Sequence, residues 1–237
     1  MTGDVAARVA SLDWAGIEAS LEEHGVAVTA PLLDGRERSA LRGLYAEDAR
    51  FRSTVVMSHH GFGRGEYRYF DQPLPELVQE LRERLYPRLA PVANRWAEQL
   101  RDEARFPARL GPFLARCRDA GQTRPTPLLL KYGAGDYNCL HQDLYGEVWF
   151  PLQAVFLLSE PGKDFSGGEL VLTEQRPRAQ SRPHVVPLEA GAAAIFPVRD
   201  RPRASVRGHS RVRMRHGVSE LRSGSRFSLG IIFHDAR

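Results

Sequence analysis

Two stretches near the C-terminus, RVRMRH at residues 211–216 and RFSL at residues 226–229, decide the expected fold. In the first, strict alternation places the apolar residues and His216 on one face of a β-strand and three arginines on the other. A histidine on an apolar face is more often a core residue than a metal ligand, so alternation alone gives His216 no role. Ten positions further on, Arg226 opens the final strand with Ser228 on the same face. Because a planar guanidinium suits bidentate binding of a carboxylate, the two stretches together favour a histidine ligand followed by a carboxylate anchor.

The tripeptide His141-Gln142-Asp143 supplies two further candidate ligands. On a strand, residues i and i+2 point to the same face, so the imidazole and the carboxylate can converge on one ion. Two histidines and one carboxylate occupy one face of an octahedron and leave the other face open for substrate and O2. The tripeptide alone is a weak signal, because a surface pair at a turn has the same sequence. The remaining histidines are His24, His59, His60, His184, His209, His216 and His234. Among them, the spacing to Arg226 favours His216.

The first half of the chain predicts helices and the second half predicts strands. Apolar spacing and capping residues indicate helices at about residues 14–25, 34–47, 74–100 and 105–119. Pro87 and Pro91 are expected to break or kink the third of these. Alternating segments indicate strands at residues 127–132, 147–158, 169–173, 184–188, 193–198, 205–215 and 226–233. Turn signals such as VRDRPRA at residues 198–204 separate them, and many short strands at this spacing favour a sandwich or barrel.

Between the predicted helices lies the segment STVVMSHHGFGRGEYRYF at residues 53–70. It is typical of a strand, a glycine-rich turn and a second strand, and it is rich in histidine, arginine and tyrosine. Loops of this composition are often binding loops, and a plain surface hairpin is an equally good interpretation.

Length and composition indicate one globular domain. The chain has 237 residues, of which 42% are hydrophobic and 26% are charged. Its two cysteines are too few for a disulfide framework, and no apolar run approaches the ~20 residues needed to cross a bilayer, so no membrane partner is expected. The N-terminus lacks the apolar core of a signal peptide, which makes a cytoplasmic location the expectation. We therefore predict a single domain over residues 1–237, with mainly helical support in residues 1–120 and a β core in residues 126–237.

Charge is unevenly distributed along the chain. Residues 1–48 contain nine acids against four arginines, whereas residues 176–226 contain twelve arginines against three acids. Such asymmetry can mark a surface for a polyanion. The alternative is a merely solvated face, since arginine is favoured over lysine throughout the sequence.

Together, the H-x-D tripeptide, a distal histidine and an arginine ten residues later resemble the double-stranded β-helix (jelly-roll) oxygenases that use iron(II) and 2-oxoglutarate. Tyr132, nine residues before His141, resembles a tyrosine that contacts 2-oxoglutarate in AlkB-type nucleic-acid demethylases. The turn FSGGEL at residues 165–170 resembles the GGEL turn of prolyl-4-hydroxylase-like members. Stretches such as KYGAGDYNCLHQDLYGE and RHGVSELRSGSRFSLGIIFHDA are similar to a bacterial family of 2-oxoglutarate oxygenases proposed to act on damaged nucleic acids, and this resemblance covers nearly the whole chain.

The resemblance implies an α+β fold, with a jelly-roll core and N-terminal helices packed on one sheet. It also implies that iron(II) and 2-oxoglutarate bind, with O2 as the other co-substrate and ascorbate as an accessory reductant. The implied metal ligands are His141, Asp143 and His216, and the implied 2-oxoglutarate contacts are Arg226, Ser228 and Tyr132. In this class 2-oxoglutarate is converted to succinate while the substrate is hydroxylated, and a hydroxylated N-alkyl carbon is then lost as an aldehyde.

One position departs from the AlkB-type pattern. Those enzymes carry a second arginine six residues after the anchoring one, and here that position is Ile232. A single basic anchor is more like the prolyl-hydroxylase branch. The departure leaves the expected co-substrate unchanged and weakens the AlkB-like substrate class.

The leading functional hypothesis is oxidative dealkylation and repair of damaged DNA or RNA. Candidate phosphate contacts are Arg199, Arg201, Arg203, Arg207, Arg211, Arg213 and Arg215. Candidate substrate contacts on the hairpin are His60, Tyr67, Arg68 and Tyr69, with the aromatic rings and Phe70 able to stack on or wedge beside a flipped base. The alternatives are a protein (prolyl) or small-molecule hydroxylase with the same metal site, and a non-enzymatic iron or oxygen sensor.

Overall fold

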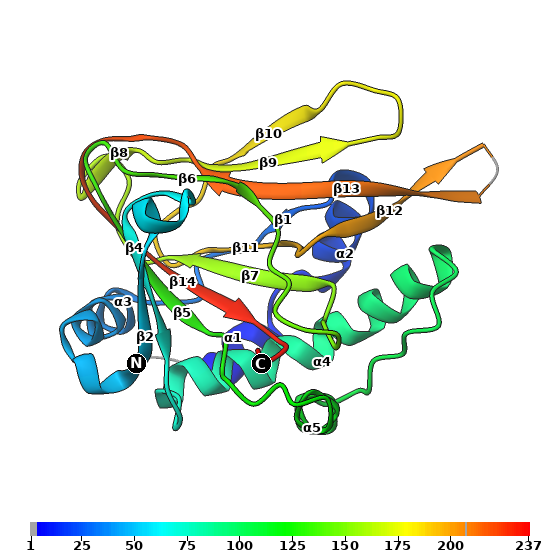
Figure 1. Cartoon of the computed structure of the whole chain (residues 1–237), viewed down its shortest axis with the longest axis horizontal. Coiled ribbons are helices and arrows are strands. Elements are labelled where there is room, and N and C mark those ends of the chain that lie inside the picture. The colour runs from blue at the N-terminus through cyan, green and yellow to red at the C-terminus, as the bar shows by residue number, and fades with distance from the viewer. Residues whose placement is uncertain (1–3, 207) are drawn as a thin grey trace.

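Two β-sheets lie face to face, and helices cover the outer side of one of them (Figure 1). The arrangement is that of a computed structural model, which describes residues 4–206 and 208–237. Arg207, one of the candidate phosphate contacts, lies outside the described residues. The prediction of a jelly-roll core with helices packed on one sheet is confirmed.

Helices occur mainly in the first half of the chain, and strands dominate the second. The helical elements of the described residues are α1 (Val5–Ala10), α2 (Trp14–His24), α3 (Gly35–Gly43), the 3-10 turns η1 (Leu44–Ala46), η2 (Asp48–Arg50) and η3 (Met57–His60), α4 (Glu76–Gln99) and α5 (Leu110–Asp119). The strands are β1 (Ala27–Val28), β2 (Phe51–Val56), β3 (Gly63–Arg64), β4 (Glu66–Phe70), β5 (Leu128–Gly133), β6 (Tyr137–His141), β7 (Leu152–Leu157), β8 (Phe165–Gly167), β9 (Leu170–Gln175), β10 (Arg182–Val186), β11 (Ala193–Pro197), β12 (Asp200–Ser205), β13 (Gly208–Val218) and β14 (Leu221–Ile232).

The strand order places segments from distant parts of the chain side by side. The larger sheet has the order β1-β11-β7-β14-β5-β4-β2, and β8 pairs with β14 outside this path. The smaller sheet has the order β10-β9-β13-β6-β3, and β12 pairs with β13. As a result β13 lies beside β6, and β14 lies in the middle of the larger sheet between β7 and β5.

Strand β14 shows why the larger sheet has two different faces. Its residues Leu229, Ile231 and Phe233 (the residue after the strand) pack in one core cluster with the helices. Arg226 and Ser228 alternate with them and line a cavity between the sheets. The period-two geometry of a strand thus gives one face to the helical layer and the other to the interior.

Helix α4 dominates the helical layer. Its residues Leu81 and Leu85 are fully buried against the larger sheet, and the buried stripe continues to Trp96. Pro87 and Pro91 lie inside this helix, which runs unbroken past both, so the expected break is wrong. Packing of the apolar stripe offsets the backbone hydrogen bonds that the two prolines remove.

A buried ion pair fastens α4 to the end of β14. Arg82 donates to the carbonyl oxygens of Ile232 at 3.0 Å and Phe233 at 2.9 Å, and it pairs with Asp235 at 2.8 Å. A buried charge is tolerated when its partners satisfy it in this way. The contact fixes the end of the strand that carries Arg226.

The hairpin predicted at residues 53–70 is present and joins both sheets. Strands β2 and β4 pair in the larger sheet, and between them the chain crosses to the smaller sheet, where Gly63 of β3 pairs with Asn138 of β6. Gly63 has a φ of +126°, and an added Cβ would lie 2.3 Å from the carbonyl oxygen of Tyr137, so only glycine fits this close approach. The two sheets are therefore connected at this point by backbone pairing.

One predicted turn is a strand. Most of the segment VRDRPRA, residues 198–204, forms β12 rather than a turn. Proline has no N–H with which to bond a neighbouring strand. Pro202 is tolerated there because β12 is an edge strand that pairs with β13 alone. The predicted strand at residues 205–215 becomes β13, which is the second arm of a hairpin and begins at Gly208.

Candidate active site

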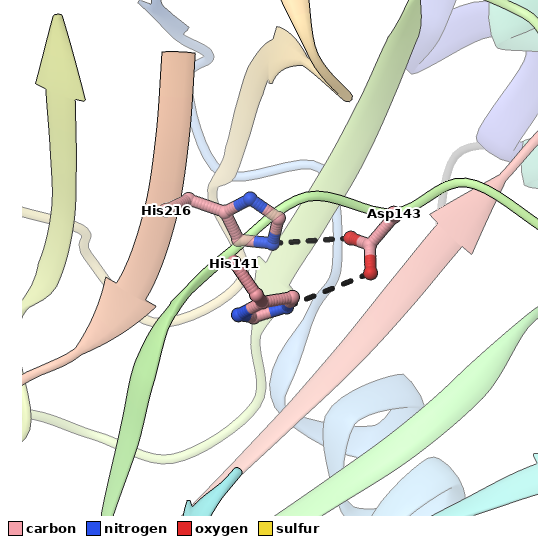
Figure 2. A group of neighbouring side chains, drawn as sticks. All are labelled: His141, Asp143 and His216. Carbon is pink, nitrogen blue, oxygen red and sulfur yellow. Dashed lines mark ion pairs between the residues drawn. The ribbon is translucent and has the colours of Figure 1, made fainter. Parts of the chain in front are cut away.

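Three side chains of the kinds that bind metals meet between the sheets (Figure 2). His141 ends β6, and His216 of β13 is its register partner. Nε2 of His216 lies 3.1 Å from Oδ2 of Asp143, and Nε2 of His141 lies 3.5 Å from Oδ1. One possible ligand atom from each residue lies within 4.8 Å of the other two. Ligand atoms about 2 Å from one metal ion stand about 3 Å apart, so a single ion can contact all three.

Asp143 does not lie on the strand that carries His141, contrary to the expectation from the H-x-D tripeptide. Strand β6 ends at His141, and Asp143 belongs to the loop that follows. The N–H of Asp143 donates to the carbonyl oxygen of Val198 at 3.3 Å, and the Gln142 amide donates to that of Met214 at 2.9 Å. These contacts direct the loop so that the carboxylate faces the histidines.

Hydrogen bonds outside the cluster orient two of its members. Nδ1 of His141 donates to the carbonyl oxygen of Cys139 at 2.8 Å, which directs Nε2 toward Asp143. Oδ1 of Asp143 accepts from the Tyr145 hydroxyl at 2.8 Å, and that hydroxyl accepts from Tyr69 at 3.0 Å. The first bond fixes the orientation of the His141 ring, and the second fixes that of the Asp143 carboxylate.

The surroundings of Asp143 favour its charged form. Burial by itself raises the pKa of Asp143, but the adjacent His216 and His141 rings and the Tyr145 hydroxyl outweigh burial and hold this pKa below its ordinary range. Burial and the neighbouring His216 lower the pKa of His141. An ionised carboxylate beside a neutral imidazole is the protonation state that a metal ion requires.

A cavity of about 330 Å³ connects this cluster with the predicted co-substrate residues. Its lining includes all three members of the cluster together with Arg226, Ser228 and Tyr132. The structure thus brings the six residues predicted for metal and co-substrate into one enclosed space. Leu130 of β5 and Val155 of β7 add apolar wall between the polar groups.

Arg226 is a buried cation that forms no ion pair among the described residues, although the Glu169 carboxylate is near enough to raise its pKa. It is 2% exposed, its Nη1 donates to the Ser228 hydroxyl at 3.3 Å, and its Nε has no hydrogen-bond partner in the described chain. Burial lowers the pKa of Arg226 and raises that of Tyr132 to about 12, so Tyr132 keeps its proton as a donor. A buried guanidinium costs free energy unless an anion pairs with it. This cavity is therefore built to receive a carboxylate or a similar anion.

The hairpin residues predicted to contact substrate separate into two groups. Tyr67 and Tyr69 line the cavity, with ring centroids 5.4 Å apart. Arg68 points to the opposite face of β4, where it pairs with Asp48 at 2.6 Å. The prediction that Arg68 contacts the substrate is therefore wrong. The reason is the alternation of side chains along a strand.

Two other hairpin residues lie outside the cavity wall. His60 is exposed in η3 and stacks on Phe62, a cavity-lining residue, with ring centroids 5.3 Å apart. Phe70 is fully buried in the core under the helices, so it cannot wedge beside a base. His60 can approach a substrate only at the rim, next to Phe62.

Tyr145 and Asn138 are site residues that sequence reasoning missed. Tyr145 holds the Asp143 carboxylate, and the Asn138 amide donates to the Tyr132 hydroxyl at 3.4 Å. The available signal was positional, because Tyr145 follows Asp143 by two residues in the sequence His-x-Asp-x-Tyr.

Comparison with protein families identifies the class. Residues 65–236 match the family Oxygenase-NA, described as an oxygenase catalysing oxidative methylation of damaged DNA. The chain belongs to this oxygenase family. A relative, the uncharacterized protein Rv2227 of Mycobacterium tuberculosis strain H37Rv, is 52% identical over 167 residues, which are 70% of this chain and 72% of that protein. Among the described residues of this family member, no helix has the length and apolar character to span a membrane.

Solved structures share the fold of this oxygenase at low sequence identity. A prolyl-4-hydroxylase from Pseudomonas putida has 18% identity and a TM-score of 0.51, with 94% of this chain and 99% of that chain covered. A 2OG-Fe(II) oxygenase family member from Burkholderia pseudomallei has 19% identity and a TM-score of 0.52, with coverages of 94% and 92%. A prolyl hydroxylase from Trichoplax adhaerens has 13% identity and a TM-score of 0.55, with coverages of 94% and 89%. At these identities the similarity shows a common fold.

Proposed function

We propose that this protein is an iron(II)- and 2-oxoglutarate-dependent dioxygenase that removes alkyl groups oxidatively from damaged nucleic acid. One observation carries the proposal. A buried guanidinium that forms no ion pair among the described residues, that of Arg226, lines the same cavity as the cluster of His141, Asp143 and His216. The cluster suits a metal ion and the guanidinium suits a carboxylate, which are the two needs of this chemistry.

The residues present fit iron(II). Two imidazole nitrogens and one carboxylate oxygen form the donor set of non-haem iron oxygenases, and they leave coordination positions open. His141 uses Nδ1 for a backbone carbonyl, which leaves Nε2 free for the ion. The surroundings of Asp143 favour its ionised form. The Tyr145 hydroxyl donates one hydrogen bond to Oδ1, which leaves lone pairs of the carboxylate free for a metal ion. No other group of three such residues within reach of one ion occurs in the described ranges 4–206 and 208–237.

The protein residues bind, orient and enclose the reactants. When bound, iron and 2-oxoglutarate supply the oxidation of a substrate C–H bond by O2, with release of succinate and CO2. Arg226 binds the distal carboxylate of 2-oxoglutarate, and the hydroxyls of Ser228 and Tyr132 donate to the same group. Leu130 and Val155 present apolar surface to the same cavity.

A damaged nucleic acid is the substrate class that we favour. The family description concerns damaged DNA, and hydroxylation of an N-alkyl carbon leads to loss of that carbon as an aldehyde. Tyr67 and Tyr69 line the cavity as aromatic groups against which a base can pack. Prolyl or small-molecule hydroxylation is the second candidate, because Ile232 lines the cavity where AlkB-type enzymes carry a second arginine.

A succinate assay over a substrate panel tests the proposal. The panel contains N-methylated DNA and RNA oligonucleotides, the same oligonucleotides without methylation, and proline-containing peptides. We expect iron-dependent succinate formation that the methylated oligonucleotides stimulate, with an equal amount of formaldehyde. Stimulation by the peptides alone would assign the second candidate function, and no succinate with any substrate or with 2-oxoglutarate alone would refute the chemistry.

A further inference from the structure

A groove lined by arginines lies on the smaller sheet, and two of its residues, Asp200 and Arg211, also border a second pocket that is lined by α4 and α5. Its volume is about 410 Å³, and we call it the arginine groove. Arg176 and Arg178 of the β9–β10 turn line it together with Arg211 and Arg213 of β13. In Figure 1 the β9–β10 and β12–β13 hairpins project from the same end of the smaller sheet. Two separate hairpins thus supply the positive charges of one groove.

The charge of the arginine groove is only partly compensated. Its one carboxylate, Asp200, contacts Arg211 at 3.3 Å, and Arg176 pairs with Glu174 at 2.8 Å. Arg178 and Arg213 are exposed and form no ion pair within the described part of the chain. Two guanidinium groups without ion pairs repel each other in one groove. An anion that binds between them lowers this repulsion.

Glu174 and Asp200 are turned away from solvent, whereas Arg178 and Arg213 are turned toward it. Arg201 is fully buried, so the prediction that it contacts phosphate is wrong. Glu174 is 1% exposed and is held by Arg201 at 2.6 Å and Arg203 at 2.5 Å. Asp200 is 4% exposed, while Arg213 and its neighbour two residues on, Arg215, are both exposed. An anionic partner in the groove therefore meets four arginines and a single, buried carboxylate, that of Asp200.

Strand β13 connects the arginine groove with the candidate metal centre. Arg213 precedes His216 by three residues, which is about 10 Å along an extended strand. The two side chains point to opposite faces of the sheet, one outward and one into the cavity. The groove and the cavity have no lining residue in common, so a polymer held in the groove must pass around the edge of the smaller sheet to place a base in the cavity.

We propose that the arginine groove binds the sugar–phosphate backbone of the nucleic acid whose damaged base is oxidised in the cavity. The inference rests on the proposed function and names the surface that holds the rest of that substrate. Alternate residues of a strand are about 6.6 Å apart, so Arg211, Arg213 and Arg215 form a row of regularly spaced charges suited to successive phosphates. Guanidinium groups bind phosphate oxygens bidentately and without regard to base sequence. The groove thus supplies affinity, and the cavity supplies selection.

The double variant Arg178→Ala, Arg213→Ala tests the groove, because it removes one uncompensated charge from each hairpin. Its matched control is Arg36→Ala, Arg118→Ala, which removes two exposed arginines without ion pairs from α3 and α5. Binding of a labelled methylated single strand of about 12 nucleotides is measured by fluorescence anisotropy between about 50 and 200 mM salt. We expect affinity about tenfold lower in the groove variant and a salt slope smaller by about 1.4, since each phosphate contact contributes about 0.7. The control variant should match the wild type.

Turnover separates failure of the groove from failure of the proposed function. With the same oligonucleotide, the groove variant should show a raised KM and a retained kcat for succinate formation. Equal affinity and salt slope in the groove variant and the wild type would overturn the inference, whatever the activity. Tight binding of an acidic polysaccharide or acidic protein at the groove, without binding of nucleic acid, would overturn it too. Wild-type protein that forms no succinate with any nucleic acid would instead refute the proposed function, and the anisotropy result would still decide the groove.

Discussion

Replacing Arg226 with methionine should stabilise the ligand-free protein while strongly reducing its response to 2-oxoglutarate. The guanidinium is 2% exposed, has one long hydrogen bond to Ser228 at 3.3 Å, and forms no ion pair among the described residues, with Glu169 acting on it only from a longer distance. Burial lowers the pKa of Arg226 because the charged form is desolvated. Methionine is flexible and apolar, so it keeps the packing against Tyr132 and Phe165 and removes the buried charge.

The substitution is expected to raise the unfolding free energy of the ligand-free protein and to lower the stabilisation that 2-oxoglutarate adds. Replacing a poorly compensated buried charge with an apolar side chain can stabilise a protein by about 1–4 kcal/mol, and about 1 kcal/mol raises Tm by about 2–4 °C at this chain length. We therefore expect ligand-free Arg226→Met to melt at least about 2 °C above the wild type. At about 100 times its Kd, 2-oxoglutarate stabilises the wild type by about 2.7 kcal/mol. Loss of a buried charge pair costs about 2–5 kcal/mol, so the variant should bind roughly 30- to 4000-fold more weakly.

Thermal melts with and without 2-oxoglutarate, in the presence of manganese(II) to prevent turnover, measure both effects. The matched control is Arg118→Met in α5, an exposed arginine that forms no ion pair within the described residues and that should change neither Tm nor the response to 2-oxoglutarate. A variant Arg226→Met that keeps the full wild-type response would refute the assignment of the carboxylate anchor. A large drop in Tm of the ligand-free variant would show instead that Ser228, the two rings and Glu169 compensate the buried charge.

Three further predictions concern the metal centre and the charge cluster beneath the arginine groove. His216→Ala should abolish iron binding and succinate formation, while His209→Ala, on the exposed end of the same strand, should preserve both; metal analysis and the succinate assay check this. Tyr145→Phe removes the hydroxyl that donates to Asp143 and should weaken manganese(II) binding about 10- to 100-fold in a calorimetric titration, and an unchanged affinity would contradict its positioning role. Burial raises the pKa of Glu174, but its arginine partners outweigh burial and hold it at about 2, below the ordinary value of 4.5, so Glu174→Gln should cost about 3 kcal/mol of unfolding free energy at neutral pH. Because a depressed carboxylate pKa stabilises the protein above about pH 4.5 and this contribution disappears as the pH falls toward 2, urea unfolding should show the difference shrinking over that interval; a difference independent of pH would point to packing instead.

Local periodicity explains what the sequence could predict. Alternation over residues 211–216 predicts a strand with His216 inward and Arg215 outward, and the burial pattern of β13 has that form. The same rule gives Arg226 and Ser228 one face of β14. Applied to the hairpin, it would also have separated Arg68 from its two tyrosine neighbours. These features depend on the geometry of a single strand, so neighbouring letters are enough to show them.

Contacts between distant segments explain what the sequence could not predict. Asp143 faces the histidines because its loop is hydrogen-bonded near Val198, and nothing in the H-x-D tripeptide encodes that contact. Pro202 and its charged neighbours resemble a turn, and only the partner strand β13 makes them a strand. Pro87 and Pro91 remain inside α4 because the sheet beneath the helix supplies the missing stabilisation. In each case tertiary packing overrides a local preference.

The alternation on β14 has a consequence for the first hundred residues. A slip of one residue along that strand would carry Arg226 out of the cavity and put Phe227 in its place. The apolar residues that β14 shows to the helices, together with the bonds from Arg82 of α4 to Ile232 and Phe233, exclude such a slip. None of the described cavity-lining residues belongs to α4, yet the contacts of this helix with β14 help to fix which side chain faces the three candidate ligands. The helical layer therefore fixes the register of β14, the strand that carries Arg226.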